Sequence, residues 1–229
     1  AADRFFDALA GVTDPEEKRK IIGRVFIEVF DVVAKEIGAE VLVQGTIYSD
    51  RIESGISQHA STIKSHHNVG GLPKEMNLAV YEPLAELYKD EVRKIAVMVG
   101  LPETLSKRQS FPGPGLGIRV LGEVTRDKVA IVRKASAIVE QEMQGVMEFT
   151  GDNKAFAVLL PVQVVGVQGD ARTYKFPIVV RILESTDVMT ANFSRVSWDV
   201  LGRISTRITN EIRDVNRVVY DITNKPPGT

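Results

Sequence analysis

The sequence has 229 residues, of which 44% are hydrophobic and 26% charged, with 29 basic and 30 acidic side chains and no cysteine. This length predicts one large or two small domains with a buried core, and the absence of thiols excludes cysteine nucleophiles, thiolate metal sites and disulfides. Because the net charge is near zero and no apolar run approaches the roughly 20 residues that cross a bilayer, we expect a cytoplasmic protein that binds neither nucleic acid nor membrane.

The first half of the chain predicts alternating strands and helices. Residues 14–17 are typical of a helix start, and apolar residues recur at helical spacing over 21–33. We expect this helix to have one broad buried face and to end near Gly38. A short strand is predicted at 40–47 and a second helix at 82–100. Strands separated by helices favour a doubly wound parallel sheet with covered faces.

The segment between that strand and the second helix, residues 48–79, is polar and weakly periodic. A loop of this length predicts a functional lid or a disordered segment. It contains all three histidines, His59, His66 and His67, but neighbouring histidines lack the i, i+4 spacing of a helical zinc pair, which disfavours a metal site. A doubly wound domain begins with a strand, whereas this chain begins almost directly with a helix, so we expect an upstream portion of the domain to be missing.

The second half predicts a smaller α+β domain. Strands are expected at 118–124, 155–167, 173–183 and 215–222, and helices at 125–143 and 197–212, which is a βαββαβ order. Residues 1–117 hold 14 basic and 17 acidic side chains, whereas residues 118–229 hold 15 and 13, and ten of those 15 are arginines. The planar fork of arginine suits phosphate or carboxylate recognition and interface pairing, so this domain is a candidate for either.

Several segments could carry chemistry. Residues 43–54 leave the carboxyl end of a strand, where ligands bind in open α/β sheets, although a solvated turn explains them equally well. Lys64 could contact a phosphate or a developing negative charge. The Pro- and Gly-rich residues 111–117 form either an interdomain linker or a shaped loop that holds a flat ring or a phosphate. Arg217 and Lys225 flank the last predicted strand, where the alternative is a polar tail.

In their order along the chain, these segments resemble GMP synthetase over nearly the whole length. The segments that carry the resemblance are 14–23, 44–54, 63–73, 82–93, 111–116, 166–170 and 221–227. The resemblance implies an adenine-nucleotide alpha-hydrolase-like (ATP-pyrophosphatase) domain at 1–117, which lacks its N-terminal part, and a C-terminal dimerisation and XMP-binding domain at 118–229. The length is similar to that of the separate synthetase subunit of archaea.

The resemblance also implies the reaction and the partners. MgATP adenylates O2 of XMP, and ammonia then displaces AMP to give GMP, with pyrophosphate as the other product, in de novo guanine nucleotide biosynthesis. The chain is expected to form a homodimer through its C-terminal domain. Because fused GMP synthetases make ammonia with a cysteine-dependent glutaminase domain, and this chain has no cysteine, a separate glutamine amidotransferase subunit or free ammonia is expected to supply the nitrogen.

The site residues that the resemblance implies fall into three groups. Catalytic roles are expected for Asp50, Glu53, Lys64 and Lys89. Contacts with ATP are expected from Gln44, Gly45, Thr46, Lys64 and Lys89. Contacts with XMP are expected from Arg19, Phe111, Pro112, Gly113, Pro114, Gly115, Lys154, Arg217 and Lys225. In the second domain, some XMP contacts are expected to cross between subunits.

Three departures from the family pattern accompany these expectations. The family's Ser-Gly-Gly-Val-Asp-Ser pyrophosphate loop is absent from the sequence, so its magnesium ligand is expected upstream and no metal ligand within this chain. Lys154 stands where the family often has glutamine, and the family's Ile-Glu-Trp/Phe-Glu ending does not follow Thr229. The alternatives are a related ATP pyrophosphatase with another acceptor, such as deamido-NAD or citrulline, and a catalytically inert dimerisation fragment.

Overall fold

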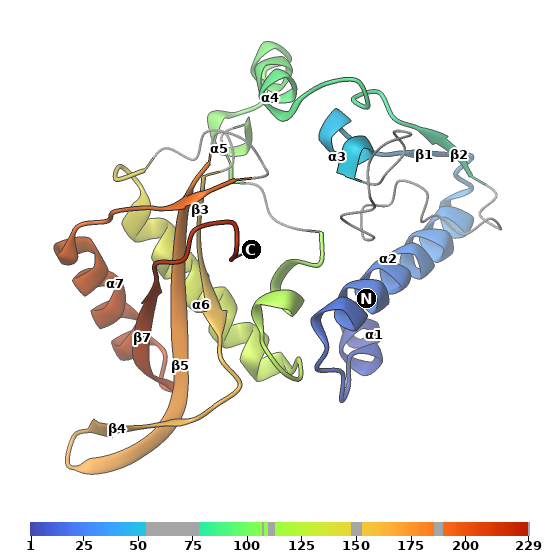
Figure 1. The fold of residues 1–229 in the computed structure, drawn as a ribbon. Helices are drawn as coiled ribbons and strands as arrows, with labels where there is room; N and C mark the ends of the chain where they lie inside the picture. Colours follow the sequence, from blue (N-terminus) through green and yellow to red (C-terminus); the bar gives the residue numbers. More distant parts are fainter. Residues whose placement is uncertain (54–77, 107, 110–112, 148–152, 186–189, 229) are drawn as a thin grey trace. The chain divides into compact units, whose positions relative to one another are not determined.

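The computed structural model describes residues 1–53, 78–106, 108–109, 113–147, 153–185 and 190–228. The chain divides into two compact units, which are residues 1–8 with 19–108 and residues 9–18 with 109–229 (Figure 1). The domain boundary between residues 117 and 118 stays a prediction. No helix in the described part of the chain is long and apolar enough to span a membrane.

Helix α2 (Pro15–Ile37) has the ends that its sequence predicts. Asp14 Oδ1 accepts a hydrogen bond of 2.8 Å from the backbone N–H of Glu17, which satisfies one of the free donors of the first turn. Gly38 follows the helix with φ of 65°, a left-handed conformation that glycine adopts without steric cost. Local capping chemistry therefore explains both ends of this helix.

The broad buried face expected for α2 is wrong for most of its length. Ile22 and Val25 are buried near the start of the helix, and Phe26 makes an edge-to-face contact of 5.1 Å between ring centroids with Phe5 of helix α1 (Ala2–Ala8). Further along, however, Phe30 is 51% exposed. The apolar period identifies the hydrophobic side of a helix, but burial also needs a facing element.

The first unit contains a parallel strand pair, as the alternating pattern predicts. Strand β1 (Val41–Val43) runs parallel to β2 (Ala79–Tyr81), with Leu42 opposite Val80. β1 is shorter than the predicted strand at 40–47, and β2 lies where no strand is predicted. The pair gives this unit a mixed α/β character, whereas the larger doubly wound sheet stays a prediction.

Three short helices complete the first unit, namely α3 (Tyr48–Glu53), α4 (Lys89–Met98) and α5 (Glu103–Ser106). The prediction that residues 48–53 belong to a loop is therefore wrong. The predicted helix at 82–100 begins only at Lys89, because Tyr88 has an extended backbone and its N–H donates to Glu91 Oε2 at 2.7 Å. This capping hydrogen bond starts the helix one residue after Tyr88.

The second unit is built around one long central strand. Its strands are β3 (Lys154–Leu159), β4 (Val164–Gln168), β5 (Ala171–Glu184), β6 (Asn192–Phe193) and β7 (Val215–Asp221). β5 pairs antiparallel with β3, β4 and β6 and parallel with β7. The single strand predicted at 155–167 is thus two strands, separated by residues 160–163. β4 and the start of β5 form a hairpin that extends beyond the rest of the sheet (Figure 1).

Two helices cover one face of this sheet and confirm the helices predicted at 125–143 and 197–212. They are α6 (Arg126–Met143) and α7 (Trp198–Glu211), and each has a hydroxyl cap, because Thr125 accepts from Lys128 N–H and Ser197 accepts from Val200 N–H. The helices pack against each other and against β3 and β7 (Figure 1). The fully buried core includes Val132, Val139, Ile178, Ile182, Ile204 and Ile208.

The strand predicted at 118–124 is wrong. Residues Gly115–Arg119 form the 3-10 helix η1, and only Val120 makes an isolated parallel bridge, to Leu159. The chain then turns at Gly122, which has φ of 72° and leaves no room for a longer strand. The buried Lys18 Nζ holds this turn by donating to the carbonyl oxygens of Val120, at 2.8 Å, and Gly122.

Candidate active site

The first cluster of predicted site residues lies at the carboxyl ends of β1 and β2. Gln44 N–H donates to the Tyr81 carbonyl at 2.9 Å, which extends the strand pairing by one residue. The buried hydroxyl of Thr46 donates to Glu82 Oε1 at 2.5 Å and lies 3.4 Å from Gln44 Oε1. A Cβ atom at Gly45 would meet no other described atom within 4 Å, so this turn has open space beside it. Ligands of open parallel sheets bind at such an edge.

Glu82 contacts a predicted site residue, although the sequence analysis gives it no such role. There it is only part of a predicted helix, yet its carboxylate contacts the predicted ATP-binding residue Thr46. A signal exists, because Glu82 directly follows a strand end, as Gln44 does on the neighbouring strand. This position of Glu82 can be recognised in the sequence only if β2 is predicted as a strand.

Asp50 has a role in the start of α3. Its Oδ2 accepts a hydrogen bond of 3.0 Å from Ile47 N–H, which caps the helix. Arg51 of the same helix forms an ion pair with Glu86. Asp50 is thus held close to the strand ends, although part of its hydrogen-bonding capacity serves the helix. Glu53 is the last residue of α3.

Lys89 is the first residue of α4 and is half-buried. Tyr48, the first residue of α3, contacts the two residues before this helix. Its N–H donates to the Leu87 carbonyl at 3.0 Å, and its ring lies 5.1 Å from that of Tyr88 between centroids. The structure therefore ties the first residue of α3 to the two residues that precede α4, the helix that Lys89 begins. Lys64 lies outside the described residues, as do the three histidines.

The second cluster lies at one end of the sheet in the second unit. Lys154 begins β3 opposite Leu183, which also pairs with Phe193 of β6. Phe193 N–H donates to Asn224 Oδ1 at 3.0 Å, and the next residue, Lys225, makes two backbone hydrogen bonds to Ala191, of 2.8 and 3.0 Å. The structure thus brings the starting residue of β3 and the segment of Lys225 to the same end of the sheet.

Gln109, which precedes the Pro- and Gly-rich segment in the sequence, is held beside β3. It is buried, its Nε2 donates to the Ala155 carbonyl at 3.2 Å, and its Oε1 accepts from Ala155 N–H at 3.1 Å. Ala155 directly follows Lys154, so these two hydrogen bonds hold Gln109, four residues before Gly113, next to that lysine's strand. Gln109 is not among the predicted site residues, because nothing in its local sequence indicates that it is buried. Residues 111 and 112 lie outside the described part.

Arg217 and Lys225 do not lie together within one chain. Arg217 is exposed, and its Nη2 lies 3.4 Å from the Val165 carbonyl, near the β4–β5 hairpin. Asp221 lies four positions after Arg217 on β7, which is about 13 Å of extended chain, and Lys225 follows beyond that end. Arg19 belongs to the first unit, in the second turn of α2, and is half-buried, so its contact with XMP stays a prediction.

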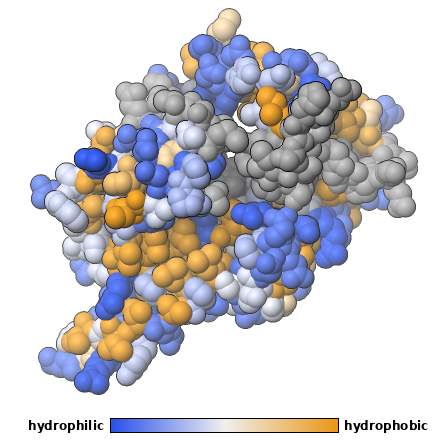
Figure 2. Space-filling view, in the orientation of Figure 1, coloured by the Kyte–Doolittle hydropathy of each residue, from blue (hydrophilic) through white to orange (hydrophobic). Residues whose placement is uncertain are grey.

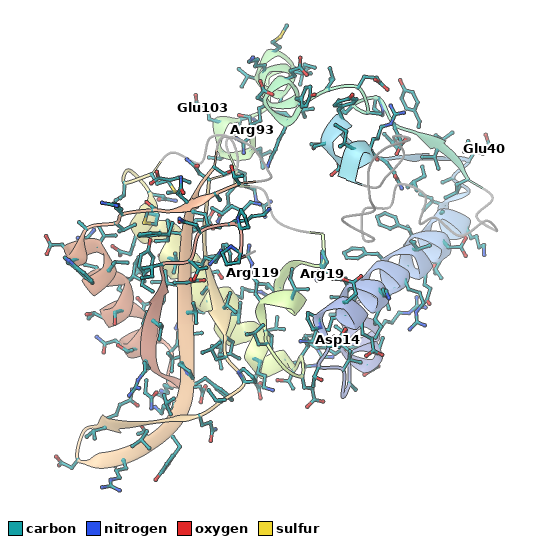
Figure 3. All side chains as sticks on the ribbon, in the orientation of Figure 1. Asp14, Arg19, Glu40, Arg93, Glu103 and Arg119 are labelled. Atoms are coloured by element: carbon teal, nitrogen blue, oxygen red, sulfur yellow. The ribbon has the colours of Figure 1, made fainter. Side chains whose placement is uncertain are left out.

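A row of interacting side chains crosses the sheet of the second unit. Phe156 of β3, Arg181 of β5 and Asp221 of β7 are direct cross-strand partners, and Arg181 forms an ion pair with Asp221. The buried Arg119 guanidinium lies 4.2 Å from the centroid of the Phe156 ring (Figure 3). Burial lowers the pKa of Arg119 to about 10. Sequence analysis does not predict this row.

The pKa of Asp221 lies below its ordinary value. Burial alone would raise it, but hydrogen bonds from Thr223 and Arg181 stabilise the ionised carboxylate and more than offset that effect. Tyr220, next to it, donates to the Ser194 carbonyl, and burial raises the pKa of its hydroxyl to about 12. Asp221 is therefore held as an anion and Tyr220 as a neutral donor near neutral pH.

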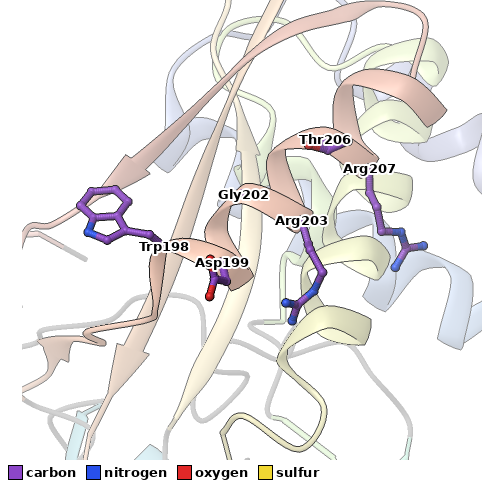
Figure 4. Close-up of a pocket in the computed structure, with 6 residues that line it drawn as sticks. All are labelled: Trp198, Asp199, Gly202, Arg203, Thr206 and Arg207. Atoms are coloured by element: carbon purple, nitrogen blue, oxygen red, sulfur yellow. The ribbon is translucent and has the colours of Figure 1, made fainter.

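A surface concavity on α7 contains none of the predicted residues. It has a volume of about 490 Å³ and is lined by Trp198, Asp199, Gly202, Arg203, Thr206 and Arg207 (Figure 4). Both arginines form ion pairs with Glu142 of α6. Among the described residues, no group of three or more histidine, aspartate or glutamate side chains is placed to hold a metal ion.

Comparison with known proteins decides the family. Residues 139–229 match the model of the GMP synthase C-terminal domain. The whole chain is 63% identical to a subunit of the glutamine-hydrolyzing GMP synthase of Pyrococcus horikoshii and covers 72% of that subunit. The chain belongs to the GMP synthase family. It is similarly 62% identical to the corresponding subunit of Thermococcus kodakarensis, of which it also covers 72%.

The GMP synthase relatives include longer proteins. The chain is 55% identical to the glutamine-hydrolyzing GMP synthase of Nostoc sp. and covers 44% of its length. The family resemblance inferred from the sequence is thus confirmed, as is its consequence that the protein is a ligase of GMP biosynthesis. The matched C-terminal domain begins within α6 and extends through β7.

Proposed function

We propose that this chain carries out the synthetase steps of GMP formation. O2 of XMP attacks the α-phosphorus of ATP and pyrophosphate leaves; ammonia then attacks C2, and AMP leaves with O2, which gives GMP. The observation that supports this proposal most is the 63% identity, over the whole length of the chain, to a subunit of an archaeal GMP synthase. Adenylation converts a poor oxygen leaving group into a good one, so the protein has to orient two nucleotides and exclude water.

The strand ends of the first unit are the proposed ATP site. Gln44, Gly45 and Thr46 offer amide, backbone and hydroxyl groups next to Glu82, at an edge where ligands of parallel sheets bind. Lys89, like Lys64, would supply positive charge to the phosphates or the adenylated centre. We further propose that this unit is part of a doubly wound ATP-pyrophosphatase fold, which the parallel β1–β2 pair supports.

Magnesium is implied by the use of ATP, but the described donor set does not fit a magnesium site. The carboxylates near the strand ends are already engaged, since Asp50 accepts from Ile47 N–H and Glu82 accepts from Thr46. No cluster of three acidic groups exists among the described residues.

The sheet end of the second unit is the proposed XMP site. Lys154 and Lys225 lie on segments at this end of the sheet, on either side of β5 and β6. Gln109, which precedes the 111–115 segment, is held beside β3 at Ala155. Two cationic side chains and a Pro- and Gly-rich loop suit a phosphate and a flat purine ring. Glycine permits the loop backbone to approach the base closely.

The second unit also offers a surface for the proposed homodimer. Hydrophobic side chains gather over the β4–β5 hairpin and the adjoining sheet (Figure 2), and Val167 is 71% and Tyr174 61% exposed. Contiguous exposed apolar surface is typical of interaction sites. Arg217 lies beside this surface and far from Lys225 of its own chain, so we propose that it contacts XMP bound to the second copy.

We propose that a glutamine amidotransferase subunit delivers the ammonia. The names of the archaeal relatives describe one subunit of a glutamine-hydrolysing synthase, which supports a second subunit for glutamine hydrolysis. The chain itself has no cysteine to serve as a glutaminase nucleophile. A cytoplasmic location remains a prediction from composition.

A substrate panel tests the proposed reaction. The full-length protein is incubated with MgATP, ammonium and either XMP, deamido-NAD or citrulline, and pyrophosphate and nucleotide products are measured. We expect only XMP to accelerate pyrophosphate release, with GMP and AMP formed in equal amounts. Acceleration by deamido-NAD or citrulline instead would favour a related ATP pyrophosphatase, and no release with any acceptor would favour the inert dimerisation fragment.

A further inference from the structure

The Arg181 side chain is an unusual core residue of the second unit. It is 4% exposed, and its Nη1 donates to Asp221 Oδ2 across the β5–β7 pair. Its Nε and Nη2 atoms are buried and have no hydrogen-bond partner within the described part of the chain. Unsatisfied buried donors reduce stability, and a hydrophobic side chain often replaces a buried ion pair without loss. A contribution to stability therefore does not account for an arginine at this buried position.

The Arg181–Asp221 ion pair contacts the segment that follows β7, residues 222–228, which we name the closing segment. Asp221 Oδ1 accepts a hydrogen bond of 2.9 Å from Thr223 N–H, so the carboxylate holds the first turn after β7. At the other end, a Cβ atom on Gly228 would lie only 2.7 Å from Arg181 Nη2. The guanidinium is thus in close contact with one end of the closing segment and linked through Asp221 to the other.

Lys225 lies in the middle of the closing segment. Its backbone pairs with Ala191, and Asn224, the residue before it, accepts from Phe193 N–H and also from Gly228 N–H through its carbonyl. These hydrogen bonds fix the segment against β6, while the Arg181–Asp221 pair fixes its two ends. The path of the backbone at Lys225 therefore depends on the buried ion pair.

We propose that Arg181 and Asp221 are positioning residues that hold Lys225 in place for the XMP anion, an inference that rests on the proposed role of Lys225. The ion pair itself does not touch the substrate. A fixed backbone places the lysine ammonium where the substrate charge binds, so less side-chain and loop entropy is lost on binding. Loosening the closing segment should then weaken XMP binding without affecting ATP.

A double-mutant cycle tests this proposal in the full-length protein. Asp221→Asn keeps an acceptor for Thr223 N–H but removes the charge that pairs with Arg181, and it is combined with Lys225→Ala. We expect Asp221→Asn alone to raise the dissociation constant of XMP about threefold to tenfold, with the KM for ATP unchanged. In the Lys225→Ala background the same change should have almost no further effect. Glu142→Gln, which removes an ion-pair partner on α6, is the matched control and should leave XMP binding unchanged.

The outcomes separate this inference from the proposed function. Unchanged XMP affinity in Lys225→Ala would overturn the proposed role of the lysine itself. If Lys225→Ala weakens binding but Asp221→Asn has no effect, or the same effect in both backgrounds, the positioning role is wrong and Arg181 acts independently of Lys225. Arg181→Lys, measured alongside with its circular dichroism spectrum and melting temperature, provides a second variant should Asp221→Asn not fold.

Discussion

At the scale of single residues, the unexpected features of this protein are buried polar side chains. Gln109, Lys18 and Arg181 are all nearly inaccessible, and each makes hydrogen bonds with residues far away in the sequence. Burying a polar group is costly unless it is hydrogen-bonded, so each of these contacts ties two distant segments together. Two of them hold segments of the proposed XMP site.

Gln109 provides a direct test of that site. Gln109→Glu keeps the acceptor for Ala155 N–H but replaces the donor that satisfies the Ala155 carbonyl. We expect a higher KM for XMP with an unchanged KM for ATP, together with a loss of about 1–3 kcal/mol in the free energy of unfolding, the cost of a buried unsatisfied group. Steady-state kinetics and urea unfolding measure both. Gln141→Glu, on the surface of α6, is the control; equal KM shifts in the two variants would contradict the prediction.

The lowered pKa of Asp221 predicts that its contribution to the free energy of unfolding depends on pH in the acid range. Its pKa is lower in the folded protein than in the unfolded chain, so the unfolded state binds more protons as the pH falls. The stabilisation by Asp221 is therefore complete above its unfolded pKa of about 4 and is lost as the pH falls through the lower folded value. The free energy of unfolding is measured for the wild type and Asp221→Asn at pH 7 and near pH 2.5. We expect the two proteins to differ at pH 7 and to differ less near pH 2.5. A constant difference would contradict this assignment.

At the scale of elements, capping residues mark the helices well, whereas the strand prediction fails at turns. The helices predicted at 125–143 and 197–212 begin within one residue of the observed α6 and α7, whose caps are Thr125 and Ser197, because capping is a contact within one turn of the chain. The predicted strand at 118–124 is wrong because the chain around Gly122 turns against Pro161 of another segment. A β-branched composition does not reveal such a turn.

Gly122 should therefore be intolerant of substitution. Its φ of 72° is strained for other residues, and a Cβ atom would lie 2.9 Å from Cβ of Pro161. Gly145 has φ of 77° with no described atom within 4 Å of such a Cβ and is the matched control. We expect Gly145→Ala to cost about 1 kcal/mol from backbone strain and Gly122→Ala measurably more, by chemical denaturation. Equal losses would show that the contact with Pro161 is easily relieved.

At the scale of the whole molecule, the proposed homodimer explains why Arg217, near the start of β7, and Lys225, beyond its end, lie apart within one chain. Val167→Glu, on the apolar surface of the hairpin, should convert the dimer to a monomer in sedimentation experiments, because burying an unpaired carboxylate is unfavourable. Trp198→Glu, on the exposed part of α7, is the control and should leave the dimer intact. Loss of the dimer in the control alone would assign the interface to α7.

Subunit mixing tests whether Arg217 acts across the dimer. Arg217→Ala and Lys225→Ala proteins are each expected to bind XMP weakly, and they are mixed under conditions that allow subunit exchange. If the two residues contribute to one site from different subunits, each mixed dimer contains one site with both wild-type residues, so about a quarter of all sites should recover activity. If both residues act within one chain, every site lacks one of them and mixing restores nothing.

The sequence alone determined the family, both ends of α2 and the positions of α6 and α7, and it favoured a parallel sheet in the first unit. These features depend on residue identity and on contacts within a few positions of the chain. The tertiary structure alone decided that Gln109 closes on Ala155, 46 residues away, and that Arg181 pairs with Asp221, 40 residues away. It also decided that Arg217 lies near the start of β7 and Lys225 beyond the end of that strand. Such pairings follow from strand register and from burial of polar groups, and no local pattern encodes which distant partner satisfies a buried donor.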